Sequence, residues 1–182
     1  MGPRGAAGIF EEHPLVKPAK IWLVSAMDSA DGRAAERAQA EQAASRLSGE
    51  AVRQVYALTS HAAMQTAAIL AAPHGLEVQA QDGSPEPGEA ASAEELRTAA
   101  HRAREVLEAI ARRTSGRTAI VVTSRAVIQL VVCDLLGMPL DHREQIGQES
   151  CAANLLIRQD YGWVIESVND DCRVTEPPES AG

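Results

Sequence analysis

Short apolar segments alternate with longer segments of helical pattern along this chain. The apolar segments are rich in β-branched and aromatic residues and lie at 21–24, 52–58, 118–123, 155–158 and 163–168. Strands that alternate with helices indicate a largely parallel sheet with helices on both faces. The pattern therefore predicts an α/β fold, a three-layer α/β/α sandwich around a mostly parallel central sheet.

Three helices are predicted from their composition and end signals, at 33–47, from Ser92 to about Gly116, and at about 126–136. The first is built from Ala, Glu, Gln and Arg, all strong helix formers, and Gly49 follows it. Ser92 with Glu95 three residues later matches a capping box. Gly137 ends the third helix, because glycine is the usual residue just beyond a helix end.

Segments rich in glycine and proline mark the limits of the folded part. Residues 1–18 are expected to form a flexible amino-terminal arm, and residues 176–182 a disordered tail. The remaining 19–175 have the length of one domain with a single core. Within it, residues 82–91 combine two glycines with two prolines and predict a flexible surface loop.

Charge and composition disfavour several classes of partner. The net charge is −8 and aromatic residues make up 3% of the chain, which argues against nucleic-acid binding. No apolar run reaches the roughly 18 residues of a membrane span, and no secretory signal pattern is visible, so a cytoplasmic protein without membrane contact is expected. Three cysteines without CxxC spacing, Cys133, Cys151 and Cys172, predict reduced thiols rather than disulfides or a zinc site. No metal and no cofactor are predicted.

Five segments in order resemble motifs of one enzyme family. They are IWLVSAM (21–27), ERAQAEQAASRL (36–47), YALTSHAAMQTAAIL (56–70), IVVTSRAVIQLVV followed by LGMPL (120–140), and VNDDCRV (168–174). Together they resemble the L-V-R-H-G, G-x-x-Q-A, S-S-P-x-x-R-A-x-Q-T-A, V-V-S-H-G and L-N-D-x-x-H-L motifs of the histidine phosphatase superfamily, whose members include the phosphoglycerate mutases. The resemblance covers roughly 19–175 and implies that family's three-layer fold.

The resemblance also implies a chemistry that this sequence lacks. In that family one histidine attacks phosphorus, a second histidine and two arginines hold the phosphoryl oxygens, and an acid protonates the leaving group. In this chain, the resemblance places Ser25 at the position of the first arginine and Ala26 at the position of the nucleophilic histidine. It places Ala62 at the position of the second arginine and Ser124 at the position of the second histidine. Because a methyl group cannot attack phosphorus, phosphohistidine-dependent phosphatase or mutase activity is not expected.

A crevice at the carboxyl ends of the parallel strands is nevertheless expected to remain a binding site. The residues expected to bind a ligand there are Ser25, Ala26, Met27, Ala62, Ser124 and Arg125. Glu149 and Cys151 are further candidates beside the pocket, and Asp82, Glu86 and Glu89 are the candidate acids on the loop. Arg125 adds a cation at a helix amino terminus, although surface arginines more often form salt bridges.

Two further residues are candidates for catalysis if the pocket now serves another reaction. His61 is the best candidate acid or base, although a solvated histidine without a role is the commoner case. Asp28 is placed to polarise His61 or bind a cation, but short acidic residues before helices are usually caps.

Three functional hypotheses follow. The first is a pseudoenzyme that binds a small-molecule ligand or a protein partner through the vacated pocket. The second is an enzyme redirected to an elimination, isomerisation or cyclisation of an organic substrate, including an anionic one. The third is a structural subunit, as a homodimer. Convergence of His61, Asp28 and Arg125 on one pocket favours the second hypothesis, and a pocket filled by Met27 favours the third.

Overall fold

The computed structural model describes residues 17–28, 34–58, 60–83, 86–88 and 90–172. The predicted arm, apart from residues 17 and 18, and the predicted tail therefore lie outside the described residues. The strands are β1 (Ala19–Ser25), β2 (Val52–Leu58), β3 (Val78–Gln81), β4 (Thr118–Thr123), β5 (Ala153–Gln159) and β6 (Gly162–Asp170). The α-helices are α1 (Ala34–Leu47), α2 (His61–Ala71), α3 (Ala93–Arg113) and α4 (Arg125–Leu136), with 3-10 turns η1 (Ala72–His74) and η2 (Leu140–Gln145).

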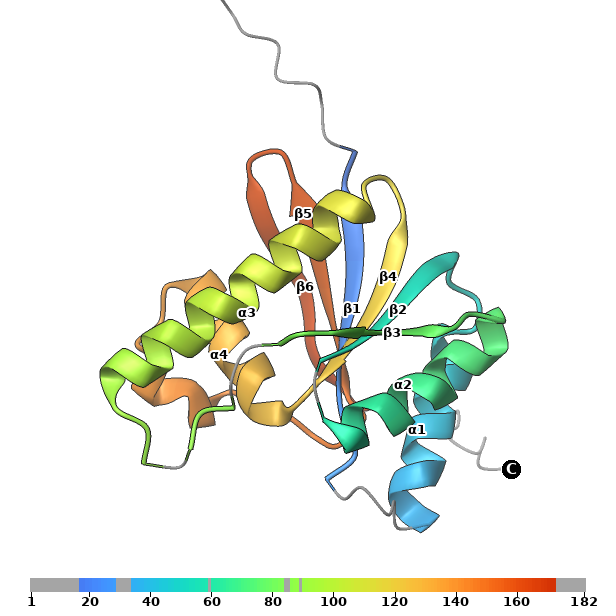
Figure 1. The fold of residues 1–182 in the computed structure, drawn as a ribbon, viewed down its shortest axis with the longest axis horizontal. Helices are drawn as coiled ribbons and strands as arrows, with labels where there is room; N and C mark the ends of the chain where they lie inside the picture. Colours follow the sequence, from blue (N-terminus) through green and yellow to red (C-terminus); the bar gives the residue numbers. More distant parts are fainter. Residues whose placement is uncertain (1–16, 29–33, 59, 84–85, 89, 173–182) are drawn as a thin grey trace, which may run out of the picture.

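The six strands form one mixed sheet in the order β3-β2-β4-β1-β5-β6 (Figure 1). Strands β1 to β4 pair in parallel, as expected for strands joined through helices. Strand β5 pairs antiparallel with both β1 and β6 and is the one reversed strand among those described, so the mixed sheet is mostly parallel, as expected. The pairing of β5 with β6 has a local reason: only Asp160 and Tyr161 separate the two strands, and so short a connection joins antiparallel strands.

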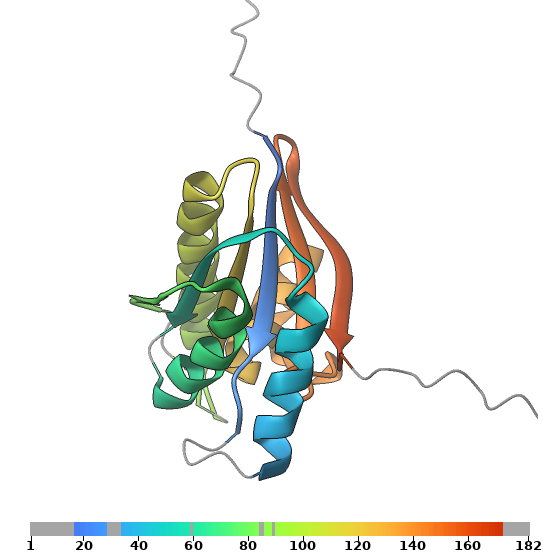
Figure 2. The ribbon, with the colours of Figure 1, turned by 90° about the vertical axis from the view of Figure 1, so that its right-hand side faces the viewer.

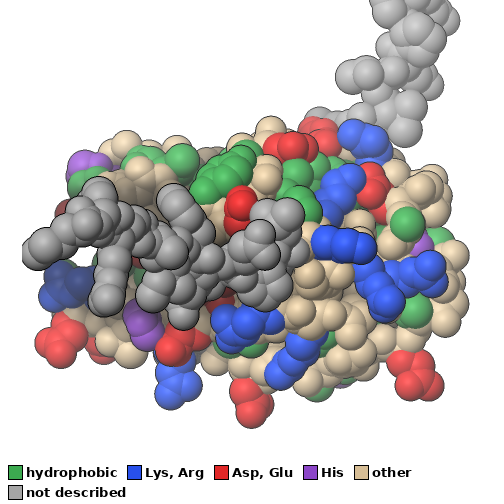
Figure 3. Space-filling view, turned by 90° about the horizontal axis from the view of Figure 1, so that it is seen from above, with side chains coloured by type: hydrophobic (Ala, Val, Ile, Leu, Met, Phe, Trp, Pro, Cys, Tyr) green, Lys and Arg blue, Asp and Glu red, His purple; other side chains and the backbone are tan. Residues whose placement is uncertain are grey.

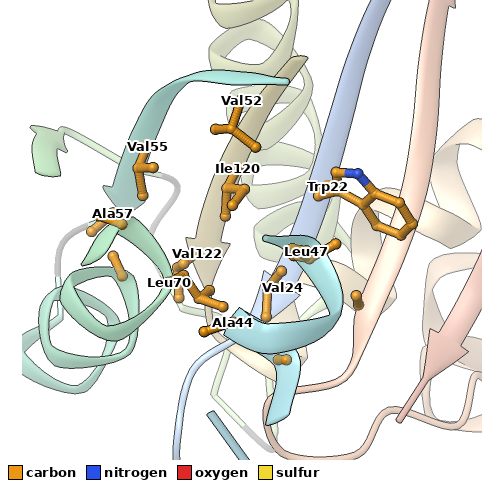
Figure 4. Packing of buried hydrophobic residues seen from close by; sticks show 14 of the residues in the cluster. Trp22, Val24, Ala44, Leu47, Val52, Val55, Ala57, Leu70, Ile120 and Val122 are labelled. Atoms are coloured by element: carbon orange, nitrogen blue, oxygen red, sulfur yellow. The ribbon is translucent and has the colours of Figure 1, made fainter. Parts of the chain in front are cut away.

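Helices cover both faces of the sheet and give the three predicted layers (Figure 2). Helices α1 and α2 pack on one face, where Leu47 and Leu70 meet Val24, Val55 and Val122 of the strands (Figure 4). Helices α3 and α4 pack on the other face through residues that include Leu107, Ile110, Ile128 and Val131. The alternate residues of each central strand therefore point into two separate apolar cores.

The end signals of the predicted helices are confirmed. The Ser92 hydroxyl accepts a hydrogen bond from the Glu95 amide, and the Glu95 carboxylate accepts one from the Ser92 amide, which completes the capping box of α3. Gly137 follows α4 with a φ of 67°. The sequence pattern did not predict α2 or β3. Strand β3 was not predicted because it is a short, polar edge strand. Helix α2 was not predicted because its many alanines give little periodic difference between apolar and polar positions.

Charged side chains of both signs share the surface at the amino ends of the parallel strands. On the face drawn in Figure 3, Lys and Arg side chains lie among Asp and Glu side chains, with hydrophobic side chains between them. Among the described residues, no helix is both long and apolar enough to cross a membrane.

Candidate ligand-binding site

A pocket of about 870 Å³ lies at the carboxyl ends of β1 and β4, at the lower end of the sheet in Figure 1. The two strands run in parallel register up to Ser25 and Thr123, so the chain leaves both at the same edge. Helices α2 and α4 begin there, and their first turns line the pocket. The pocket is lined by Ala26, Met27, Asp28, Ser60, His61, Ala62, Glu86, Pro87, Ser124, Arg125, Ala126, Gln129, Arg143 and Glu144.

Three of the positions where the resemblance implies lost chemistry lie on this pocket. Ala26 follows β1 directly and is buried, and its amide donates a hydrogen bond to the Thr123 carbonyl. Ala62 is in the first turn of α2. Ser124 caps α4 and accepts a hydrogen bond from the Val127 amide at 3.4 Å. Small neutral side chains therefore form the part of the wall where a phosphatase needs imidazole and guanidinium groups.

Ser25 is not brought into the pocket. It is fully buried, and its hydroxyl donates to the Glu149 carbonyl at 2.5 Å, while Gln148 Nε2 donates to the same hydroxyl at 3.5 Å. Ser25 therefore anchors the segment before β5. Glu149 does not line the pocket either.

Cys151 is buried away from the pocket against Met27 and Ala40. Its burial raises the pKa of the thiol to about 11, so this cysteine is a packing residue and not a nucleophile at neutral pH.

Met27 separates this pocket from a neighbouring one. The Met27 amide donates a hydrogen bond to Thr66 Oγ1 at 3.1 Å, which fixes the chain after β1 against α2. The second pocket, of about 880 Å³, lies between α1 and α2, and Met27 also lines it. Met27 is thus a wall shared by two pockets and does not fill the one at the strand ends.

Asp28 and Arg125 form an ion pair on the pocket. Arg125 Nη2 lies 2.9 Å from Asp28 Oδ1 and 3.2 Å from Oδ2. About half of each side chain is exposed, 48% for Arg125 and 56% for Asp28. An exposed pair of this kind contributes only about 0–1 kcal/mol, so a ligand can replace the Asp28 carboxylate at Arg125 at little cost.

Among the described residues, His61 is the histidine that lines this pocket. It is exposed, and its Nε2 accepts a hydrogen bond from Gln65 Nε2 at 3.0 Å. The carboxylate of Asp28 is paired with Arg125 instead. His61, Asp28 and Arg125 therefore converge on one pocket, but the described contacts do not join the carboxylate to the imidazole as an acid–base pair.

Arg143, Gln129 and Glu86 complete the pocket. Arg143 lies in η2, is 8% exposed, and was not singled out by the sequence pattern. Gln129 is held by a hydrogen bond from its Nε2 to the Ile146 carbonyl at 2.7 Å. Glu86, one of the candidate acids, belongs to the loop after β3, whereas Glu89 lies outside the described residues. No local signal marks Arg143, because only the packing of η2 against α4 carries it to the pocket.

No metal site is built around this pocket. In the part of the chain that the structure describes, no group of three or more His, Cys, Asp or Glu residues is arranged to hold a metal ion. The polar groups that the pocket offers are guanidinium, hydroxyl, amide, imidazole and carboxylate groups, which suit an organic ligand.

Thr66 and Asn169, two motif residues that this chain keeps, hold backbone segments in place through hydrogen bonds. Thr66 accepts from the Met27 amide and donates to the Ala62 carbonyl. Asn169 adopts a φ of 55°, accepts from the Glu149 amide at 2.6 Å and donates its own amide to Asn154. These contacts hold the loops around the carboxyl edge of the sheet, and none of them requires phosphoryl chemistry.

Fold and pocket together define an α/β protein with a pocket at the carboxyl edge of its sheet, between the first turns of two helices. The chain belongs to the histidine phosphatase superfamily (branch 1), whose family model matches residues 80–171. The matched residues include Ser124 and Arg143 but not Ala26. A search of curated protein sequences finds no match.

Solved structures of related fold agree with this assignment. Bacillus stearothermophilus YhfR is 15% identical with a TM-score of 0.72, covering 85% of this chain and 100% of its own. A mutant phosphoserine phosphatase from Entamoeba histolytica in complex with phosphoserine is 15% identical with a TM-score of 0.68, covering 84% and 98%. A phosphoglycerate mutase from Bacillus anthracis is 13% identical with a TM-score of 0.65, covering 86% and 95%. At this identity the likeness concerns the fold.

Proposed function

We propose that this protein is a histidine phosphatase-like pseudoenzyme that binds a small-molecule ligand or a protein partner through the pocket at the carboxyl ends of β1 and β4. It performs no phosphohistidine-dependent phosphatase or mutase reaction. The observation that carries the proposal is Ala26, which lies on the pocket wall at the end of β1, where the family resemblance places the nucleophile. A methyl group there removes the covalent route, and Ala62 and Ser124 remove two of the groups that would hold the phosphoryl oxygens.

The pattern of kept and lost residues also supports the proposal. The kept residues, such as Thr66 and Asn169, stabilise loops around the pocket. The replaced residues on the pocket are small and neutral, and they leave a space of about 870 Å³. A protein that binds a ligand without turnover needs the loops that shape the pocket but not the groups that transfer phosphate, and this pattern agrees with that requirement.

The test combines turnover with binding. We expect no hydrolysis of p-nitrophenyl phosphate or phosphoserine above the rate without protein, and no phosphorylated protein in mass spectra after incubation. Ala62→Phe fills this pocket, and Ala68→Phe on the same helix fills the neighbouring one, as a matched control. Hydrolysis that Ala62→Phe abolishes and Ala68→Phe leaves intact contradicts the proposal, whereas hydrolysis unaffected by either variant comes from a contaminant.

A redirected enzyme is the second candidate, because His61, Asp28 and Arg125 line one pocket. Its reaction would be an elimination, isomerisation or cyclisation of an organic substrate, with His61 as acid or base and Asp28 beside it. NMR spectra of a bound organic ligand followed over hours distinguish the two candidates. Conversion of the ligand that His61→Asn stops supports the enzyme, and unchanged ligand supports the pseudoenzyme.

A further inference from the structure

Arg143 is a buried cation that has no hydrogen-bonded partner among the residues that the structure describes. Its side chain is 10% exposed, and its guanidinium donates no hydrogen bond to any described residue. The carboxylate paired with it belongs to its neighbour Glu144, at 3.7 Å, and that side chain is 79% exposed. Arginine stays charged at all ordinary pH values and carries five N–H donors. Burying its guanidinium therefore costs free energy of desolvation unless an anion lies beside it and accepts its hydrogen bonds.

A second cation, Arg125, lines the same pocket. Arg143 enters from η2, and Arg125 enters from the first turn of α4. The exposed Asp28 carboxylate that pairs with Arg125 is readily displaced. The amino ends of α2 and α4 also meet at the pocket and add partial positive charge. The Arg143 guanidinium, which is nine-tenths buried and donates no hydrogen bond to a described residue, is the independent observation that makes these helix ends part of a built site.

From this arrangement we infer that the pocket recognises a small organic molecule through one anionic group, a carboxylate or a phosphate ester, with Arg143 as the buried anchor and Arg125 as a second contact. The inference rests on the proposed function and specifies its ligand class. Neither arginine occupies a position that the family resemblance assigns to phosphoryl binding, since those positions hold Ser25 and Ala62.

The remaining charges restrict the ligand further. Asp28, Glu86 and Glu144 also line the pocket, so carboxylates face the ligand as well as the two arginines. A molecule with several separate anionic groups is repelled by this mixture, whereas a molecule with one anionic group and a neutral polar or apolar body satisfies it. With a volume of about 870 Å³ the pocket is also far larger than a phosphate ion needs.

The test uses isothermal calorimetry on the full chain with four probes. Phenyl phosphate and benzoate carry the two anionic groups, benzyl alcohol is the neutral control, and inorganic phosphate lacks the organic body. We expect phenyl phosphate or benzoate to bind at least tenfold more tightly than benzyl alcohol and inorganic phosphate. The stronger of the two identifies the anionic group. No preference for an anionic probe over benzyl alcohol overturns the inference.

Two variants and one control assign the binding to the arginines. Arg143→Gln should weaken binding of the anionic probe at least tenfold. Its melting temperature should stay equal to or above that of the wild type, because the exposed Glu144 carboxylate at 3.7 Å compensates the buried charge only in part. Arg125→Gln should weaken it less. Arg104→Gln is the matched control, since Arg104 pairs with Asp134 at 3.1 Å and is 49% exposed, like Arg125, but lies on α3.

Unchanged affinity in Arg143→Gln overturns the inference. So does a variant that fails to fold or melts well below the wild type, because either result makes the guanidinium a structural group. Arg143→Lys, which keeps the charge but not the planar donor fork, should retain part of the affinity. Hydrolysis of phenyl phosphate contradicts the proposed function alone, and absence of both binding and hydrolysis contradicts this inference alone.

Discussion

The hydroxyl of Thr66 is expected to contribute measurably to stability, because it is the acceptor for a buried backbone amide. Thr66 is fully buried in α2, and its Oγ1 accepts from the Met27 amide at 3.1 Å. Thr66→Val keeps the branched shape and removes the acceptor, so the Met27 amide stays buried without a partner. An orphaned buried donor costs about 1–3 kcal/mol. We therefore expect the free energy of unfolding to fall by about 2 kcal/mol, which in a chain of this size lowers the melting temperature by about 4–8 °C.

The measurement is urea denaturation followed by tryptophan fluorescence, with the slope of the free energy against urea expected to stay constant. Thr98→Val is the matched control, because Thr98 lies exposed on α3 and the same chemical change there should stay within about 0.5 kcal/mol. Amide hydrogen exchange at Met27 gives a local readout and should accelerate in Thr66→Val. Equal stability of Thr66→Val and wild type would refute the structural role of this retained motif residue.

Two other predictions concern a buried thiol and a helix end. Burial raises the pKa of the Cys151 thiol from 9.0 to about 11. The unfolded chain therefore loses this proton at a lower pH than the folded protein, and the free energy of unfolding falls as the pH rises from about 9 to about 11. Cys151→Ala should show a smaller fall in urea denaturation over that range, and an identical fall contradicts the pKa. Gly137→Ala should lower the free energy of unfolding by about 1 kcal/mol in thermal denaturation, because Gly137 has a φ of +67°. Gly49→Ala is the control and should be nearly neutral, because Gly49 lies at an open position without positive φ. Equal effects of the two changes contradict this reasoning.

Local sequence signals explain which helices and strands could be predicted. The capping box of Ser92 and Glu95 and the glycine after α4 are satisfied within a few residues, so the residue types themselves define the helix ends. The bounds of β2 and β4 also agree with their apolar segments. Strand β3 escaped because it lies at the sheet edge and two of its four residues are exposed, which leaves no apolar pattern.

Part of the pocket was predictable for a similar reason. Motif order placed Ala26 after the first predicted strand, Ala62 shortly after the second, and Ser124 just before the third predicted helix. The structure brings these three residues to one pocket. Parallel strands end at the same edge of a sheet, so strand ends far apart in sequence meet there. The expectation of Ser25 at the pocket rests on the same logic, but its hydroxyl turns to the Glu149 carbonyl, 124 residues away.

The sequence by itself determined the succession of strands and helices apart from α2 and β3. It also determined that small neutral residues stand where the resemblance expects histidine and arginine. Periodicity, capping and residue chemistry are local properties, so the sequence alone carries them. Only the tertiary structure decided that β5 runs antiparallel to β1 and that the buried Arg143 lines the same pocket as Arg125. Both depend on contacts between segments distant in the chain, and no local pattern encodes the burial of a single arginine in a 3-10 turn.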